Sequence, residues 1–298
     1  MPFKLNTILR HKEKDVAAAK KLRSIGDLKR MIRDAPPVRS FKQALAGGFG
    51  LIAEIKRKSP SGGEMLEANF VDAPGVYASS PVVKAVSILT NSNFGMKVED
   101  LRTYRSLVNK PILRKDFLTT EYEIYEARAF GADAVLLMAN VLKQDEMQRL
   151  FERACELELD VLFESHTKAE IETIPNGASI YGINSRKFMA VNRWHVANVV
   201  NKFARFGFWR PDTSPDVTVE LSTFTIVKHL PKHAIKVAES GIKPSKVQEI
   251  MGMGFDSMLV GTSLLKSPQG IQAALSEFEQ EIIPSRRKVS TLSETAHA

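Results

Sequence analysis

The sequence has a single cysteine, Cys155, among 298 residues. A disulfide within the chain needs two cysteines and a thiolate metal site needs several, so we expect neither redox nor zinc chemistry. Long hydrophobic runs are also missing, because no stretch approaches the ~18 to 20 apolar residues of a membrane helix. Residues 1–24 are basic, but they include Glu13 and Asp15 and lack the apolar core of a signal peptide. These absences predict a cytoplasmic protein that has no membrane partner.

Basic residues outnumber acidic ones and give the chain a formal net charge of +8. Such a surplus can attract nucleic acid or a small anionic substrate. The basic clusters comprise Lys20, Lys21, Arg23, Lys29, Arg30 and Arg33, and then Arg286, Arg287 and Lys288. Because no aromatic side chains that could stack on bases are interleaved with them, we interpret most of them as a solvated helical face. We expect no nucleic-acid partner.

Short runs typical of β-strands alternate with longer helical runs from residue 51 onward. The eight candidate strands are 51–56, 82–88, 111–115, 133–138, 160–164, 179–184, 234–239 and 256–260. Helical patterns lie between them, for example at 122–130, 144–158 and 244–251. This alternation predicts an α/β fold, a (β/α)8 TIM barrel. The alternative is a doubly wound open sheet, but no G-x-G-x-x-G turn follows the first strand.

The chain divides into three predicted segments. Residues 1–48 form an N-terminal helical extension whose last helix ends at Gly47 and Gly48. Residues 49–283 form the barrel, within the usual size of one such domain. Residues 284–298, rich in Ser, Thr and charge, are expected to form a disordered tail.

Polar side chains stand at the carboxyl ends of five candidate strands, where barrels carry their active sites. They are Glu54 and Lys56, Lys115, Glu164, Asn184 and Glu239. A lone E-x-K pair such as Glu54 and Lys56 would normally be a surface ion pair. Its recurrence at other strand ends favours a site, because charges there must pair or face a wet cavity.

Two glycine turns follow the last two candidate strands, Ser240-Gly241 and Gly261-Thr262. A glycine often marks no more than a turn. In a barrel, however, the loops after strands 7 and 8 commonly hold a phosphate through backbone N–H groups. We therefore predict a phosphate site at these turns.

These motifs, in this order, resemble the indole-3-glycerol phosphate synthase family. The matching stretches are IAEIKRKSPSGG, AVSILT with Phe94-Gly95 behind it, PILRKDF, GADAVLLM, LDVLFESHT, YGINSRKF, KVAESGI and MLVGTSLL. The resemblance runs from about residue 7 to residue 266. It implies ring closure of 1-(2-carboxyphenylamino)-1-deoxyribulose 5-phosphate with loss of carbon dioxide and water, a step of tryptophan biosynthesis that needs no metal and no organic cofactor.

The resemblance also implies roles for the strand-end residues. Lys115 is expected to be the general acid that protonates the substrate carbonyl. On physical grounds, a lysine that is desolvated beside another cation can have its pKa lowered toward the working range. Glu164 is expected to stabilise the cationic intermediate or to act as acid or base in dehydration. Glu54 would orient the lysines, and Lys56 would donate in dehydration or hold substrate anions. Asn184 would contact the substrate, and Ser240 is placed with these catalytic candidates.

The resemblance supplies the binding residues too. Phe94 and Phe117 would enclose the anthranilate ring, although an apolar core role is open for Phe117. Arg186 would lie near the substrate carboxylate or in the charge network, with a surface salt bridge as the alternative. The remaining candidates for substrate and phosphate contacts are Ser59, Glu239, Gly241, Gly261 and Thr262. His166 is interpreted as structural.

The chain departs from the family pattern in two loops. After the second strand, one or two residues are missing before Phe94, and Asn91 stands where the family often has an acid. After the sixth strand, residues 189–218 are expanded by roughly twenty residues, well beyond an ordinary connection. Both tryptophans, Trp194 and Trp209, lie in this expansion. We hypothesise that it forms a lid or a subunit contact, since the protein is expected to be a monomer or a homodimer.

Two other functions stay open. Another phosphate-binding barrel of the phosphoribosyl isomerase type would need an Asp and a Cys, or two Asp, as acid and base. Cys155 lies in a predicted helix, which disfavours this reading. A non-catalytic basic binding protein would have lost the strand-end polar groups, and it would show salt-dependent retention on DNA.

Deletion of residues 195–215 tests the hypothesis about the expanded loop. A lid predicts altered kinetics, and a subunit contact predicts a lower oligomeric mass by light scattering. Unchanged kinetics together with an unchanged mass would refute both versions.

Overall fold

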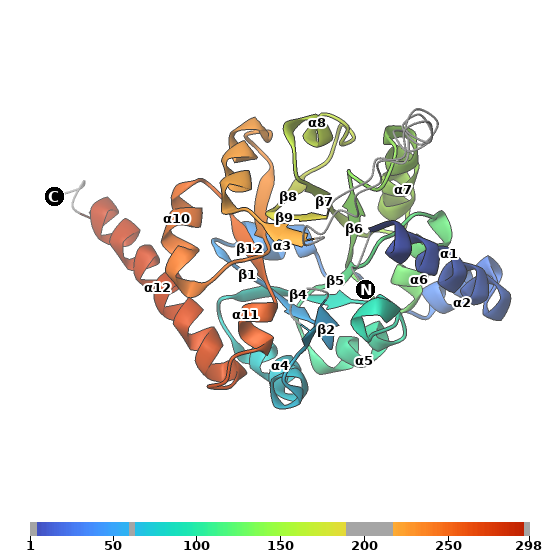
Figure 1. Ribbon diagram of the computed structural model, residues 1–298, viewed down its shortest axis with the longest axis horizontal. Helices are drawn as coiled ribbons and strands as arrows, with labels where there is room; N and C mark the ends of the chain where they lie inside the picture. Colours follow the sequence, from blue (N-terminus) through green and yellow to red (C-terminus); the bar gives the residue numbers. More distant parts are fainter. Residues whose placement is uncertain (1–4, 60–62, 189–216, 295–298) are drawn as a thin grey trace, which may run out of the picture.

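Eight parallel strands close into a barrel in the computed structural model of the protein, which describes residues 5–59, 63–188 and 217–294. The barrel strands are β1 (Gly50–Ile55), β4 (Val83–Leu89), β5 (Ile112–Lys115), β6 (Ala134–Met138), β7 (Asp160–Ser165), β8 (Ile180–Asn184), β11 (Ile235–Glu239) and β12 (Ser257–Val260). β1 pairs with both β4 and β12, which closes the barrel (Figure 1). All eight predicted strands are confirmed.

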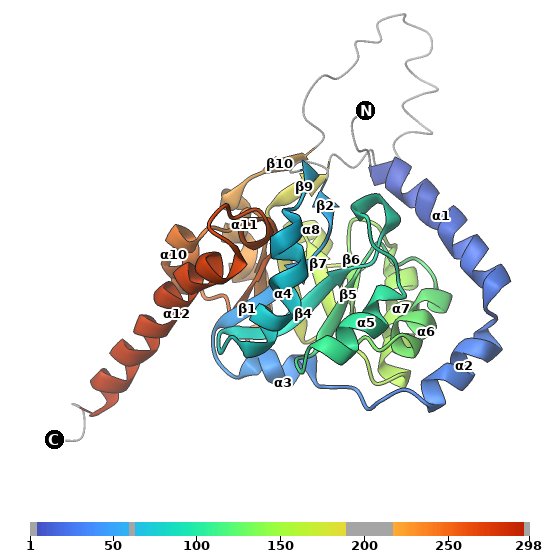
Figure 2. The ribbon, with the colours of Figure 1, turned by 90° about the horizontal axis from the view of Figure 1, so that it is seen from below.

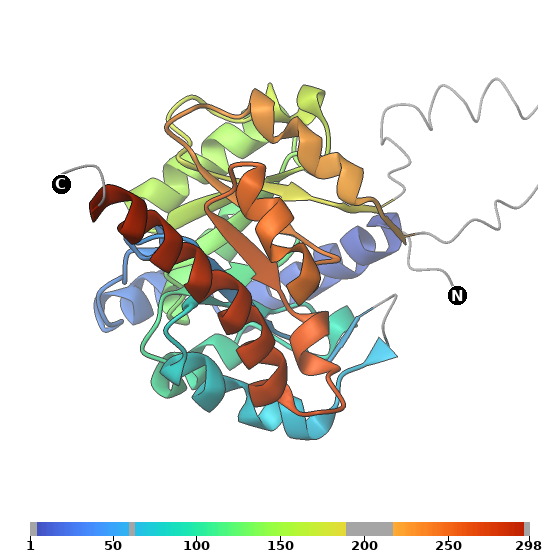
Figure 3. The ribbon, with the colours of Figure 1, turned by 90° about the vertical axis from the view of Figure 1, so that its left-hand side faces the viewer.

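Helices surround the barrel. They are α4 (Glu67–Ser79), η1 (Ser92–Phe94), α5 (Asp100–Leu107), α6 (Glu121–Ala129), α7 (Gln144–Glu156), α8 (Lys168–Ile171), η2 (Leu221–His229), η3 (Pro244–Lys246), α10 (Val247–Gly252), α11 (Thr262–Leu265) and α12 (Ile271–Glu294). The long α12 runs diagonally across the outside and packs against α4, α10 and α11 (Figure 3). Among the described residues, no helix combines the length and apolar character needed to cross a membrane.

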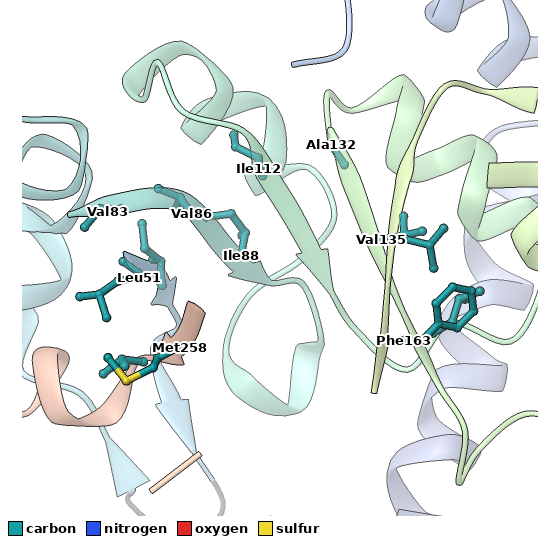
Figure 4. Close-up of a cluster of buried hydrophobic side chains, with 14 of the residues drawn as sticks. Leu51, Val83, Val86, Ile88, Ile112, Ala132, Val135, Phe163 and Met258 are labelled. Atoms are coloured by element: carbon teal, nitrogen blue, oxygen red, sulfur yellow. The ribbon is translucent and has the colours of Figure 1, made fainter. Parts of the chain in front are cut away.

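Two-residue alternation along the strands separates two apolar clusters. Leu51, Val86 and Phe163 belong to the larger cluster between the strands and the surrounding helices (Figure 4). Ile52 and Leu162 belong to the second cluster, which fills the barrel interior. Because the side chains two residues further along share the interior face, this alternation turns Glu54 and Glu164 inward.

Three helices precede the barrel: α1 (Leu5–Leu22), α2 (Ile25–Arg33) and α3 (Phe41–Ala46). α3 lies at the amino-terminal end of the strands, where Phe41 and Leu45 join the interior cluster (Figure 2). α1 and α2 lie along one flank and contact α6. The N-terminal helical extension is thus helical as predicted, and its first and last helices both contribute to the interior cluster.

Asp133 fastens this extension to the barrel. Its fully buried carboxylate accepts hydrogen bonds from the backbone N–H groups of Arg39 at 2.7 Å and Ile112 at 2.8 Å. The Arg105 guanidinium lies 2.5 Å from both carboxylate oxygens. One side chain therefore joins the segment before α3, the start of β5 and helix α5.

Two short antiparallel ribbons project at the carboxyl-terminal end of the barrel (Figure 2). They are β2 (Lys58–Ser59) with β3 (Gly63–Glu64), and β9 (Arg186–Phe188) with β10 (Val217–Val219). Most of the expanded loop 189–218, including both tryptophans, lies outside the described residues, so the lid and contact hypotheses stay predictions.

Helix α12 runs from Ile271 to Glu294 and includes Pro284, which removes a backbone hydrogen bond from the helix interior. The end of the barrel domain at residue 283 and the disordered tail that is expected after it stay predictions.

Replacing Asp133 by Ala is expected to destabilise the protein by about 3–5 kcal/mol. The partly buried guanidinium groups of Arg39, which lies 3.4 Å from Asp133, and of Arg105 lose their counter-charge, and two backbone N–H groups lose their acceptor. Urea denaturation followed by circular dichroism measures this change. Asp72→Ala, at an exposed position of α4, is the control and should change stability by less than ~0.5 kcal/mol. Equal effects of the two substitutions would contradict the assigned role of Asp133.

Candidate active site

A cavity of about 220 Å³ opens at the carboxyl-terminal ends of the strands. Charged and polar side chains line it together with apolar ones. The lining includes Glu54, Lys56, Leu89, Phe94, Lys115, Asp116, Phe117, Leu136, Met138, Glu164, Asn184, Arg186, Ser240, Gly241, Lys243, Gly261, Thr262 and Ser263. Of the fourteen candidates drawn from the sequence, this set contains all but Ser59 and Glu239.

Lys115 is the centre of the charge cluster. Its ammonium lies 2.7 Å from Glu239 Oε2 and 3.1 Å from Glu164 Oε2. The three side chains come from β5, β11 and β7, and only closure of the barrel brings them together. Burial alone would lower the pKa of Lys115, but Glu239 and Glu164 outweigh it and raise this pKa above its ordinary value. The lowered pKa that desolvation beside another cation can produce is therefore not found at Lys115, and its ammonium stays protonated at neutral pH.

Glu54 and Lys56 form a second buried pair, with 2.5 Å between Glu54 Oε1 and Lys56 Nζ. Burial lowers the pKa of Lys56, and the Glu54 carboxylate only partly offsets this effect. Arg186 and Lys115 add positive charge around the pair and act in the same direction. The lowered pKa expected beside a second cation thus belongs to Lys56.

Gly261 leaves the space that Glu54 occupies. A Cβ atom at position 261 would lie 2.5 Å from Glu54 Oε1 and 3.0 Å from Glu54 Cβ. Gly182 does the same for Glu239, since a Cβ there would lie 2.1 Å from Glu239 Oε1. Both glycines are therefore required by the close approach of a buried carboxylate to the backbone.

Glu239 lies behind Lys115 and is fully buried, outside the cavity lining. Burial raises its pKa to about 7; Lys115 opposes this shift, and the neighbouring Glu164 carboxylate reinforces it. Burial opposes the charge of Glu164 too, but Lys115 and His166 hold its pKa below the ordinary value. Glu239 therefore contacts Lys115, which lines the cavity, but does not line the cavity itself. This arrangement gives no support to a direct contact between Glu239 and the substrate.

Apolar residues form one wall of the cavity. Phe94 ends η1 and Phe117 follows β5, and both rings are nearly buried beside Leu136 and Met138. The short loop after β4 is closed by Asn91, whose side chain accepts the backbone N–H of Asn93. This wall is suited to a planar apolar ring that lies next to the Lys115 ammonium.

The opposite end of the cavity is built from the turns after β11 and β12. Ser240 and Gly241 both have positive φ, 71° and 69°. Gly261, Thr262 and Ser263 follow β12 and begin the short helix α11. The exposed Lys243 lies at the rim, where its charge complements an anion.

Sequence reasoning missed Asp116 and its partners. The Asp116 carboxylate receives a buried hydrogen bond from Lys12 of α1 at 2.5 Å, and others from Thr90 and Asn91. Burial would raise the pKa of Asp116, but Lys12 and Arg114 outweigh it and lower this pKa. Two features of the sequence could have indicated this pair. One is the Asp of the L-R-K-D-F motif, and the other is the position of Lys12 among Leu5, Ile8 and Val16 on the buried face of α1.

Metal-ligating side chains are not gathered here: across the described ranges, no three of His, Cys, Asp and Glu are arranged to hold a metal ion. Ser59 is buried in β2 and does not line the cavity, so its contact with the substrate stays a prediction.

The fold and the cavity define a (β/α)8-barrel protein with its site at the carboxyl-terminal face. Two solved barrels resemble it in fold. Thiamine phosphate pyrophosphorylase from Pyrococcus furiosus has a TM-score of 0.51 and 14% identity, covering 82% of this chain and 98% of that one. The 3-hexulose-6-phosphate synthase from Salmonella typhimurium has a TM-score of 0.52 and 14% identity, covering 80% and 99%.

The chain belongs to the indole-3-glycerol phosphate synthase family, whose sequence model matches residues 5–198. The indole-3-glycerol phosphate synthase of Bacteroides thetaiotaomicron is 37% identical over 89% of this chain and 94% of its own length. That of Thermoanaerobacter pseudethanolicus is 32% identical over 93% and 97%.

Replacing Gly261 by Ala is expected to destabilise the protein by about 1–3 kcal/mol, because the added methyl group must displace the buried Glu54. The free energy of unfolding in urea measures this change. Gly252→Ala in α10 is the matched control: nothing lies within 4 Å of the added atom, and helix propensity predicts unchanged or slightly higher stability. A Gly261→Ala variant as stable as this control would contradict the packing described for Glu54.

Proposed function

We propose that the protein is an indole-3-glycerol phosphate synthase of tryptophan biosynthesis. It converts 1-(2-carboxyphenylamino)-1-deoxyribulose 5-phosphate to indole-3-glycerol phosphate, and it is therefore a carboxy-lyase. The observation that carries the proposal is the Lys115 ammonium held between Glu164 and Glu239 beside an apolar wall. Family membership supports the choice of substrate.

Lys115 is the proton donor in ring closure. As the aromatic carbon attacks the ketone of the sugar, its oxygen gains negative charge and becomes more basic than a lysine amine. The raised pKa keeps Lys115 charged before this step, so a donor is always present at neutral pH. Transfer of its proton to the oxygen forms the hydroxyl group, and carbon dioxide then leaves the ring carbon.

Glu164 serves the later steps. Its carboxylate lines the cavity and is held ionised by Lys115, so it can stabilise a cationic iminium intermediate after decarboxylation. Dehydration needs an acid that protonates the departing hydroxyl group and a base that removes a proton from the newly closed ring. Lys56, with its lowered pKa and its contact with Glu54, is suited to donate that proton. Glu54 orients Lys56.

Binding uses the two ends of the cavity. Phe94 and Phe117 enclose the anthranilate ring, and the positive charge of Arg186 attracts its carboxylate. Asn184 and Ser240 contact the sugar chain. The backbone at Gly241 and Gly261, with Thr262, holds the phosphate, and Ser59 is placed with this group on the family pattern.

No observation favours the alternative functions. An isomerase that uses a cysteine is unsupported, since Cys155 is exposed in α7 and does not line the cavity. The proposal includes no metal or organic cofactor. A cytoplasmic location and a monomeric or homodimeric state also stay predictions.

Purified protein mixed with the carboxyphenylamino-deoxyribulose phosphate should give indole fluorescence. Lys115→Met should reduce kcat by about 10²- to 10⁴-fold, the usual contribution of a positioned proton donor. Lys97→Met, at an exposed position beyond η1, controls for loss of a surface charge and should retain full activity. No product from folded wild-type protein, or an active Lys115→Met variant, would refute the assignment.

A further inference from the structure

His166 occupies a turn next to the active site, between β7 and α8, and the proposed mechanism gives it no task. It is two residues beyond Glu164, and its side chain is 5% exposed. Its ring nitrogen Nδ1 lies 3.1 Å from Glu170 Oε2, and its backbone N–H donates to the same oxygen at 2.7 Å. Glu170 thus fixes both the backbone and the ring of His166.

The opposite ring nitrogen faces the active site. His166 Nε2 lies 3.7 Å from Glu164 Oε1, and within the described part of the chain both buried atoms lack a hydrogen bond. The other Glu164 oxygen is bound by Lys115. A movement of well under 1 Å would close the gap between His166 and Glu164 into a hydrogen bond.

The location of a proton decides whether this arrangement is stable. Since Glu170 can only accept, Nδ1 of His166 carries a hydrogen. A neutral ring would then turn the lone pair of Nε2 toward a carboxylate oxygen, which places two buried acceptors face to face. One proton between Nε2 and Glu164 Oε1 removes this conflict.

We infer that His166 is a positioning residue for Glu164 that holds this proton and exchanges it with the carboxylate during turnover. In the transfer, the Nε2–H bond breaks and an O–H bond forms on Glu164 Oε1. The ring becomes neutral, with its hydrogen on Nδ1, and Glu164 is a carboxylic acid until it returns the proton to Nε2, which restores the carboxylate that faces the iminium intermediate. The partly exposed Glu170 side chain connects the ring to solvent. The inference rests on the proposed function. It adds that His166 stores a proton which it can exchange with Glu164.

Several charges face His166. Glu164 lies near the end of β7, Glu170 lies on α8, and the charge of Glu239 acts on the ring from β11. Lys115 binds both Glu164 and Glu239. Burial alone would lower the pKa of His166, but the hydrogen bond to Glu170 and the charge of Glu164 outweigh it and raise this pKa. The ring is therefore protonated at lower pH, and this charge is lost as pH rises through the raised value.

The variants Glu170→Gln and His166→Gln test the inference. NMR titration of the imidazole, assigned by its absence in His166→Gln, should show a lower pKa for His166 in Glu170→Gln than in wild type. The alkaline limb of the kcat profile should move to lower pH in Glu170→Gln. It should disappear in His166→Gln, with kcat reduced about ten-fold and KM changed less than about three-fold, since Glu164 itself remains.

Glu172→Gln, at the exposed residue directly after α8, is the control and should leave the pH profile and the titration unchanged. Equal changes in kcat and KM with an unshifted pH profile would show that His166 is structural only. An imidazole pKa that is the same in wild type and Glu170→Gln would also overturn the inference. The NMR titration needs no turnover, so failure of the proposed function and failure of this inference are distinguishable.

Discussion

The ion pairs of Lys115 with Glu164 and Glu239 are the constraint on which the rest of the site depends. Three buried charges tolerate each other only when they are close and well oriented, because each loses its hydration on burial. Strands β5, β7 and β11 are far apart in sequence, and barrel closure brings one side-chain oxygen of Glu164 to 3.1 Å and one of Glu239 to 2.7 Å from Lys115 Nζ. The glycine at position 182 is part of this constraint, because any larger residue would collide with Glu239. The outcome is a lysine that remains charged although it is largely buried in the wall of the cavity.

The N-terminal helix α1 belongs to the site as much as to the outer shell. Lys12 binds Asp116, the residue after Lys115, and lies 2.9 Å from Glu123 at the start of α6. His11 contacts Asn93, and Ser92 donates to Asp15, so the same helix also holds the loop that carries Phe94. One helix therefore fixes the position of the catalytic lysine and of the apolar wall. This arrangement shows how a helix that lies along the flank of the barrel holds residues at the edge of the cavity.

Sequence periodicity predicted the strands and the inward-facing polar residues, because a two-residue repeat specifies both the strand and its faces. It could not predict the pair of Lys12 and Asp116, which are 104 residues apart and meet only through tertiary packing. Periodicity also could not predict whether the pKa of Lys115 is raised or lowered. Burial lowers this pKa and the two carboxylates raise it, so the distances between the groups decide the result. The substrate came from the family resemblance, since no strand-end pattern specifies which sugar phosphate is bound.

The central claim is that the charge cluster around Lys115 acts directly on the substrate. A crystal structure of the protein with indole-3-glycerol phosphate tests it most directly. The account predicts the indole ring between Phe94 and Phe117, the phosphate at the turns of Gly241 and Gly261, and Lys115 Nζ within hydrogen-bond distance of the ligand. A ligand bound in the cavity with its phosphate at another end, or with Lys115 still enclosed by its two glutamates and out of reach, would contradict the account.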